Sequence, residues 1–281
     1  MLCSIISPLY NSAPYLEACL DSLFSQTVQD FELLLVDDHS PDDSVDVARQ
    51  YVSRHGVGER VRFLQTPQNA GPGVARNLGI EAAQGDYIAF IDSDDLWEST
   101  FLERLLAAVC PTGSQQGYDL AYCQLKYNDG REHRNPVVPS GDFTVSLKRQ
   151  FLRRFVTFSV CFLFRRQFLM DNRLLFPALR NSEDTHFLTS CLLLARTIAC
   201  VDEPLYIYCV HSESLSTGRN CSKYRQRLAA LGGLMDDFRA MKRDSRYADL
   251  HLSSYNLVML LLWFKKGLTQ SIKDYVKNNL L

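Results

Sequence analysis

The sequence predicts an α/β fold, in which a mostly parallel sheet carries helices on both faces and a C-terminal helical segment follows. Two patterns lead to this prediction. Within residues 1–100, short apolar runs alternate with stretches of helical periodicity, and the loops between them are short. After Ser222 the periodicity is helical to the last residue.

Four strands are expected in the first part of the chain, over residues 3–7, 31–36, 61–64 and 87–91. The second of them, FELLLV, is nearly all apolar, as a strand covered on both faces should be. Because one helix and short loops separate each strand from the next, the strands are expected to run parallel.

Three helices are expected between these strands. Pro14 suits the first turn of the first helix, where a missing N–H is no loss. Its apolar residues fall on one face: Leu16, Cys19, Leu20, Leu23 and Phe24. The second helix is expected to begin with Ser40 as N-cap, Pro41 at N1 and Asp43 at N3. The third covers residues 74–83, after a loop that contains Gly and Pro.

The pattern after residue 97 is less regular. Helices are expected over residues 98–109 and 184–195, and strands over 120–125, 159–164, 198–201 and 205–210, the last two as a pair. Residues 128–145 contain Gly, Pro and charged residues, and are expected to form a loop.

The composition excludes several classes of protein. Apolar residues make up 46% of the 281 residues, enough for a large core and too many for a disordered chain. The formal net charge of -2 argues against a nucleic-acid-binding protein that relies on its overall charge. The nine cysteines include no C-x-x-C pair, which favours reduced thiols over disulfides or a zinc site.

Two further features favour a cytoplasmic location. The first residues lack the basic segment and the long apolar core of a signal peptide. The longest strongly apolar stretch, residues 257–264, is far shorter than the roughly 20 residues that span a bilayer.

Charge is unevenly distributed along the chain. From Arg219 to the end, Lys and Arg outnumber Asp and Glu by 12 to 5. Solvated basic helices would explain this excess, and so would a surface that approaches anionic lipid or an anionic acceptor. The second interpretation predicts peripheral contact with the inner face of a membrane.

Polar residues follow three of the expected strands. The first strand leads into SPLYN, the second ends in Val-Asp-Asp, and the fourth ends in Ile-Asp-Ser-Asp-Asp. In open α/β sheets such strand ends meet at one edge, where ligands bind. A single Asp after a strand is commonly a turn former. Several together are harder to explain as turns, because clustered carboxylates repel unless a cation or hydrogen-bond donors neutralise them.

The Asp92-Ser93-Asp94 segment suits a divalent cation, because residues two apart can both face an ion where the chain turns sharply. Hard oxygen ligands select Mg²⁺ or Mn²⁺ over zinc, and these ions complete their shell with substrate phosphates and water. The sequence contains neither a Walker A loop nor G-x-G-x-x-G, so it supports no ATPase or dinucleotide site. A diphosphate bound through Mn²⁺ or Mg²⁺ is therefore predicted.

Five segments, in this order, resemble the family 2 glycosyltransferases of the GT-A fold: SPLYN, FELLLVDDHSPDDS, NAGPGVARNLGI, GDYIAFIDSDD and NSEDTHF. The resemblance is close over residues 1–100 and looser to about residue 216. It implies a GT-A Rossmann-like domain over residues 1–216, with a nucleotide-binding half (1–100) and an acceptor-side half (101–216). Residues 217–281 carry no motif of the family and form the expected C-terminal helical extension.

The resemblance implies a site for a nucleotide-sugar donor, with uridine diphosphate as the nucleotide. Pro8, Tyr10 and Asn11 would line the base and ribose, with Tyr10 packed on uracil. Asp38 would accept a hydrogen bond from uracil N3–H, with Asp37 beside it. The implied donor site also includes Arg76 near the base or phosphates, Asp92 at the ribose or the metal, and Ser93 next to it.

The resemblance also implies a metal site and a catalytic base. Asp94, in the D-x-D motif, would be the main metal ligand, with Asp92 and His211 as further ligands. Asp184 matches the catalytic base of the family, with Glu183 as the alternative. A helix N-terminus also favours a carboxylate through its dipole, so a capping role for Asp184 stays open. His211 could equally be a structural residue.

Three departures from the family pattern stand out. His39 occupies a position where the family usually has Gly or Asn, and Asn181-Ser182 replaces the commoner Gly before the Glu-Asp pair. The Gln-x-x-Arg-Trp motif of processive polymerases is missing after the base. The resemblance therefore implies an enzyme that adds one sugar per binding event.

These implications together describe an inverting glycosyltransferase, which moves one sugar from a UDP-sugar to a hydroxyl of a glycan or lipid-linked acceptor in bacterial cell-surface polysaccharide assembly. A sugar nucleotidyltransferase would need a Gly-rich loop with Arg and Lys after the first strand, and SPLYNSAP has none. A catalytically inactive nucleotide-binding module is the second alternative. Loss of Asp94 or Asp184 would have supported it, and both are present.

Overall fold

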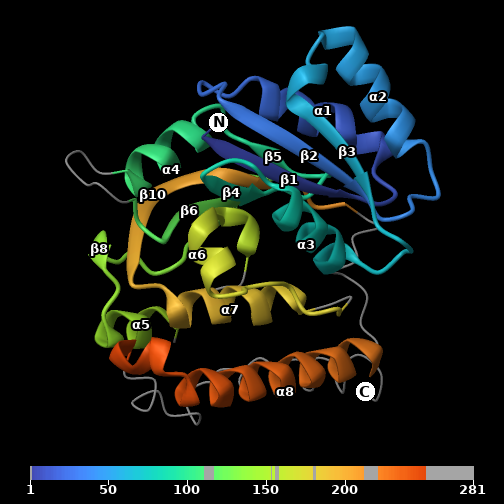
Figure 1. Ribbon diagram of the computed structural model, residues 1–281. Helices are drawn as coiled ribbons and strands as arrows, with labels where there is room; N and C mark the ends of the chain where they lie inside the picture. Colours follow the sequence, from blue (N-terminus) through green and yellow to red (C-terminus); the bar gives the residue numbers. More distant parts are fainter. Residues whose placement is uncertain are drawn as a thin grey trace, which may run out of the picture.

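A computed structural model of the chain describes residues 2–110, 117–152, 154–155, 158–179, 182–211 and 221–250 (Figure 1). The strands are β1 (Cys3–Leu9), β2 (Phe31–Asp37), β3 (Val61–Gln65), β4 (Tyr87–Phe90), β5 (Leu96–Trp97), β6 (Leu120–Tyr127), β7 (Glu132–His133), β8 (Gly141–Asp142), β9 (Phe162–Arg165) and β10 (Thr197–Tyr208). The helices are α1 (Ala13–Phe24), α2 (Ser44–His55), α3 (Pro72–Ala82), α4 (Phe101–Val109), α5 (Val145–Leu152), α6 (Arg166–Asp171), α7 (Glu183–Leu194) and α8 (Cys221–Arg243). Three short 3-10 helices complete the described elements: η1 (Gly58–Arg60), η2 (Ser159–Cys161) and η3 (Ser245–Leu250).

These strands form one mixed sheet in the order β3-β2-β1-β4-β9-β6-β10-β5, with β7 paired to β6 and β8 paired to β10. The first four strands of this order are parallel, as predicted. The strand β9 runs antiparallel to both β4 and β6, whereas β10 returns to run parallel to β6. The sheet is therefore parallel in the first half of the chain and mixed in the second.

Helices cover both faces of the sheet, which confirms the predicted α/β class. In Figure 1, α1, α2 and α4 lie on one side of it, and α3, α6 and α7 lie on the other. Gly79 lets α3 approach β1 closely, since a Cβ there would overlap the side chain of Ile6. The helix α8 packs against the outer side of α7, where it buries Leu234 and Phe238.

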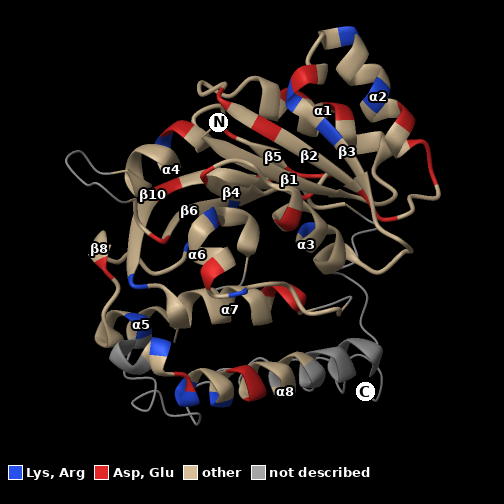
Figure 2. Cartoon of the chain, viewed as in Figure 1, with Lys and Arg blue, Asp and Glu red and all other residues tan. Residues whose placement is uncertain are grey.

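The charge of α8 is mixed where the structure describes its side chains (Figure 2). Arg239 pairs with Asp236 at 2.8 Å, and Asp237 lies 3.1 Å from His186 on α7. Most of the basic excess predicted to contact a membrane lies outside the described side chains. Membrane contact therefore stays a prediction, as does the division of the chain at residue 216.

Several predicted element boundaries are wrong, and the helix expected from residue 98 begins only at Phe101. The helix α2 begins at Ser44 rather than at residue 41, with Asp43 as its N-cap. Residues 40–43 form a turn instead, because the Ser40 N–H donates to Asp37 Oδ1 and Asp42 Oδ2 accepts the Ala13 N–H. The strands expected over residues 198–201 and 205–210 are one strand, β10, whose register against β6 shifts around Pro204.

Three further segments differ from the prediction. Residues 159–164 begin as the 3-10 helix η2 and become extended only in β9. The loop expected over residues 128–145 contains the two-residue strands β7 and β8. The helices α5 and α6 were not predicted, because short helices carry too few turns for a clear periodicity.

Candidate active site

The carboxyl ends of β1, β2 and β4 meet at one edge of the sheet, as predicted. The Asp38 N–H donates to the carbonyl oxygen of Leu9 at 3.0 Å, and the Ile91 N–H donates to that of Ile6 at 3.1 Å. Parallel pairing in register thus brings the three polar segments together. This edge is the ligand-binding position of an open α/β sheet.

The end of β1 supplies the residues predicted to line the base and ribose. Pro8 is buried in the strand, whereas the Tyr10 side chain is 45% exposed. Asn11 has a φ of 54°, a left-handed conformation that Asn tolerates better than most residues. An exposed ring on an ordered turn is available to pack against a ligand.

The two carboxylates that end β2 shape the neighbouring loops. Asp37 accepts hydrogen bonds from the Ser40 N–H and the Gln65 side chain, both at 2.9 Å. Asp38 accepts from the Ala70 N–H at 2.9 Å and the Gly71 N–H at 2.7 Å, and so engages both of its oxygens. Asp38 therefore orders the loop before α3, in addition to the base-reading role predicted for it.

An acidic turn, residues 92–95, follows β4. Asp95 is 1% exposed and accepts hydrogen bonds from the Tyr206 hydroxyl at 2.6 Å and the Cys209 N–H at 2.8 Å. Burial and the charges of Asp92 and Asp94 raise the pKa of Asp95 well above its usual value. Burial and the charge of Asp92 likewise raise the pKa of Asp94 to about 6. The turn therefore concentrates negative charge that the fold only partly offsets.

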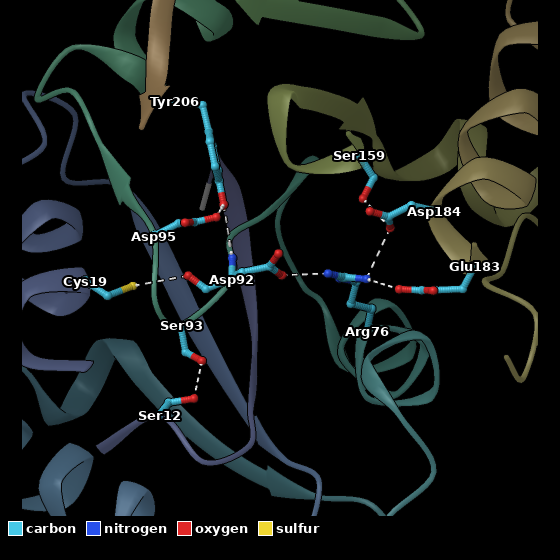
Figure 3. Close-up of polar contacts among 10 residues, drawn as sticks. All are labelled: Ser12, Cys19, Arg76, Asp92, Ser93, Asp95, Ser159, Glu183, Asp184 and Tyr206. Carbon is cyan, nitrogen blue, oxygen red and sulfur yellow. Dashed lines mark hydrogen bonds and ion pairs between the residues drawn. The ribbon is translucent and has the colours of Figure 1, made fainter. Parts of the chain in front are cut away.

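Two further side chains hold the acidic turn in place. The Ser93 and Ser12 hydroxyls share a hydrogen bond of 2.6 Å, which joins the turn to the segment before α1. The Tyr206 hydroxyl also accepts the Asp92 N–H at 3.3 Å (Figure 3). Tyr206 was not among the predicted residues, because its role depends on β10 lying beside the turn.

His211 lies at the acidic turn, as its predicted role requires. Its Nε2 is 3.3 Å from the backbone oxygen of Asp94, and its ring stacks on Tyr15 with centroids 3.9 Å apart. Tyr15 was also missed, because it lies on α1 outside the apolar face that the periodicity revealed.

Arg76 joins the acidic turn to the helix that carries the predicted base (Figure 3). Its Nη2 donates to Asp92 Oδ1 at 2.6 Å, while Nη1 lies 3.3 Å from Glu183 Oε1 and 3.2 Å from Asp184 Oδ1. The side chain is buried, and the guanidinium lies over the ring of Phe176. This bridging of three carboxylates is a role that the sequence did not predict.

The pKa values of this cluster reflect burial and mutual charge. Burial opposes the charged guanidinium, but the three carboxylates outweigh it and raise the pKa of Arg76. Burial, together with the charge of Asp184, raises the pKa of Glu183 to about 7. Burial also raises the pKa of Asp184, while Arg76 acts in the opposite direction. Arg76 is therefore the counter-ion that allows these acids to lie together.

Among the described residues, the partners of Asp184 contact one of its two carboxylate oxygens. The Ser159 hydroxyl donates to Asp184 Oδ1 at 2.8 Å, and Oδ1 is also the atom that Arg76 contacts. The described part of the chain supplies no hydrogen-bond donor to Asp184 Oδ2. Both acids lie in the first turn of α7, where the helix dipole favours negative charge.

Two residues that depart from the family pattern, His39 and Ser182, have strained backbone conformations. His39 has a φ of 58° and Ser182 has a φ of 69°, conformations in which a side chain other than that of Gly or Asn costs free energy. His39 offsets part of this cost through a hydrogen bond of 2.8 Å between Nε2 and the Thr66 backbone oxygen. The turn after β2 thus keeps its left-handed conformation with His39 in place of glycine.

The acidic turn fits a hard divalent cation by its chemistry. Within the described residues, no three His, Cys, Asp or Glu side chains converge as a ligand set. Mg²⁺ and Mn²⁺ sites need few protein ligands, because substrate phosphates and water supply the remaining ones. Asp94, whose carboxylate lies among like charges, is suited to this role.

The chain belongs to the glycosyl transferase family 2, whose pattern it matches over residues 4–173. It is 35% identical over 225 residues to the uncharacterized glycosyltransferase EpsJ of Bacillus subtilis, with 76% of this chain and 63% of EpsJ aligned. The chain thus spans about three fifths of the length of that relative. No helix in the described residues is both long and apolar enough to cross a membrane.

Two solved structures share the fold. The structure of Staphylococcus aureus TarS 1–349 in complex with UDP-GlcNAc has a TM-score of 0.65 and 24% identity, covering 83% of this chain and 66% of that one. The mannosyltransferase PcManGT of Pyrobaculum calidifontis, in complex with GDP-Man and Mn²⁺, has a TM-score of 0.60 and 17% identity. It covers 98% of this chain and 75% of that one. These similarities confirm the GT-A fold.

Proposed function

We propose that this protein is a non-processive, inverting glycosyltransferase, which transfers one sugar from a UDP-sugar to an acceptor hydroxyl. One observation carries the proposal: Arg76 joins the D-x-D segment to Asp184 through direct ion pairs. A donor site and a general base therefore lie within one side chain's span of each other, as a single displacement requires.

The donor nucleotide is proposed to bind over the ends of β1 and β2. The exposed ring of Tyr10 supports a stacking contact with the base, and Asp38 lies at the same edge of the sheet. The complex of TarS with UDP-GlcNAc supports uridine, whereas PcManGT was solved with GDP-Man. The choice of UDP over GDP therefore rests on Asp38 accepting uracil N3–H.

Mn²⁺ or Mg²⁺ is proposed to be held by Asp94, with Asp92 and His211 nearby. When bound, such a cation neutralises the charge that develops on the leaving diphosphate. The raised pKa of Asp94 supports this role, since a carboxylate among like charges gains most from a cation.

The chemical step is proposed to be a direct displacement. An acceptor oxygen attacks the anomeric carbon and forms the new glycosidic bond on the face opposite the diphosphate. The bond from that carbon to the diphosphate oxygen breaks, and UDP leaves with the electron pair. Asp184 accepts the proton of the acceptor hydroxyl, for which Oδ2 is the oxygen that the described residues leave without a donor.

The acceptor is proposed to be a growing cell-surface glycan or its lipid-linked precursor. A relative 30% identical to this chain over 213 residues, TarS of Staphylococcus aureus, is a poly(ribitol-phosphate) β-N-acetylglucosaminyltransferase, and 36% of its length is aligned. We also propose a cytoplasmic location, at the inner face of the membrane.

Hydrolysis of a panel of nucleotide-sugars, with and without Mn²⁺, tests this function. We expect slow, metal-dependent release of UDP from one UDP-sugar, and faster release once an acceptor is present. Equal calorimetric affinities for UDP, GDP and ADP in Mn²⁺ would contradict the uridine assignment. Absence of release from every nucleotide-sugar, combined with intact nucleotide binding, would favour a catalytically inactive module.

A further inference from the structure

Four aromatic side chains from separate segments form a continuous strip beside the candidate active site. The ring of Phe158 lies 6.4 Å from that of Tyr208 and 6.1 Å from that of His133, measured between centroids. Tyr127 lies 5.6 Å from Tyr208. We call these four side chains the aromatic strip.

The strip differs in burial from the aromatic core. Tyr122 and Tyr206, on the same two long strands, are fully buried. All four residues of the strip are half-buried, and the Phe and Tyr members pack against the core. The guanidinium of Arg131 covers one side of Tyr127, which leaves Phe158 and Tyr208 as the centre of the strip. Ordered aromatic rings of this kind line ligand sites.

The strip adjoins both halves of the site. Phe158 directly precedes Ser159, whose hydroxyl donates to the proposed base Asp184. Tyr208 lies two residues after Tyr206 on β10, on the same side of the strand, and Tyr206 donates to Asp95. Phe158 and Tyr208 therefore each lie within two residues of a side chain that contacts an acid of the candidate site.

The charges on β6, β7 and the turn between them favour a neutral ligand. On these segments, Lys126 pairs with Glu98, and Arg131 pairs with Asp129. Arg134 lies between two acids, 2.7 Å from Glu132 and 2.8 Å from Asp202. The described cations of β6, β7 and their turn are thus already paired and offer little to a polyanionic acceptor, whereas the exposed Arg154, four residues before Phe158, lies outside these pairs. The C–H face of a sugar ring needs only aromatic surface, and its hydroxyls remain in water.

We propose that the aromatic strip is an acceptor subsite that binds a neutral pyranose ring by its apolar face. This inference rests on the proposed glycosyltransferase function and specifies its acceptor class. The acceptor is a glycan with neutral sugar rings next to the attacked unit, rather than a poly(polyol phosphate).

The experiment measures saccharide binding separately from nucleotide binding. The full chain is saturated with UDP and Mn²⁺, and then titrated with cellobiose, maltose, lactose, N,N′-diacetylchitobiose and an oligo(ribitol phosphate), with saturation-transfer NMR as the readout. We expect at least one neutral disaccharide to bind, and Phe158→Leu and Tyr208→Leu each to weaken it roughly 2- to 12-fold, the range of an aromatic contact. Leucine keeps apolar volume and removes only the ring.

Phe63→Leu is the matched control. Phe63 is likewise half-buried, with the Arg49 guanidinium over its ring, but it lies on β3 at the other end of the sheet, so its replacement should leave saccharide affinity unchanged. Calorimetry with UDP and Mn²⁺ checks that each variant is folded. Loss of nucleotide binding by the parent protein would contradict the proposed function itself.

Three results would overturn the subsite alone while nucleotide binding stays intact. They are binding of none of the disaccharides, binding that both leucine variants leave unchanged, and binding of the oligo(ribitol phosphate) alone.

Discussion

The two acidic clusters of the site differ in how their charge is balanced. At the start of α7, Glu183 and Asp184 share the buried guanidinium of Arg76. In the acidic turn, the described residues offer Asp95 a tyrosine hydroxyl and a backbone N–H, and place His211 near Asp94, but they supply neither acid with Lys or Arg. Among the described residues, one cluster is thus balanced by an internal cation, and the acids of the other are proposed to be balanced by a ligand. Asp92 belongs to both, because Arg76 contacts it.

The largest effect is expected from removing the internal cation. Arg76→Met keeps apolar volume but leaves three carboxylates without their counter-ion, and should lower the free energy of unfolding by about 3–5 kcal/mol at pH 8. The control is Arg54→Met, whose exposed ion pair with Glu17 should contribute about 0–1 kcal/mol. Urea unfolding measures both. Equal losses of unfolding free energy in the two variants would show that the Arg76 ion pairs contribute no more to stability than an exposed pair does.

The next effect concerns Asp184, the proposed base, at the start of α7. Asp184→Asn keeps the shape of the side chain and removes its proton-accepting charge, so kcat should fall roughly 10²- to 10⁴-fold. Donor affinity should stay nearly unchanged, because the base acts on the acceptor hydroxyl. Steady-state kinetics, with calorimetric titration of UDP, separates the two quantities. Weakened donor binding with near-normal turnover would assign Asp184 a capping role, and Glu183→Gln would be measured next.

In the acidic turn, removing a carboxylate should weaken ligand binding without lowering stability. Asp94→Asn should weaken Mn²⁺-dependent UDP binding by roughly 10- to 100-fold or more, since even indirect partners of a metal ligand contribute that much. Its free energy of unfolding without metal should not fall, because burial and Asp92 already disfavour the charged carboxylate. The exposed Asp43, replaced by Asn, is the control and should leave UDP affinity unchanged. UDP affinity retained by Asp94→Asn would rule out the ligand assignment.

The smallest effect concerns the pH dependence of stability. Glu183 has a pKa of about 7 in the fold, above its usual 4.5, so the folded state binds more protons than the unfolded state between these values. Its contribution to stability is therefore fully present below pH 4.5 and is lost as the pH rises through 7. The glutamine in Glu183→Gln cannot ionise. The free energy of unfolding of this variant, relative to that of the parent, should therefore rise by on the order of 1–3 kcal/mol between pH 4.5 and 8. Parallel stability curves for the two proteins in EDTA would contradict this expectation.

Much of the parallel half of the fold could be predicted, because its signals are local. FELLLV forms β2, buried along its whole length, and Pro14 lies in the first turn of α1. The acceptor side was less predictable. One continuous β10 was expected as two strands, because the register shift near Pro204 is decided by pairing with β6 and not by the residues themselves.

The sequence by itself determined which acids end each strand, and the parallel order then required them to share one edge. Only the tertiary structure decided how those acids are balanced. Arg76 is 108 residues from Asp184, and Tyr206 is 111 residues from Asp95. The attraction between two charges weakens as the distance between them in space grows. That distance has no local signature in the sequence. The motifs therefore predicted which segments carry the acids, and the packing of α3, α7 and β10 decided which carboxylates have a counter-ion among the described residues.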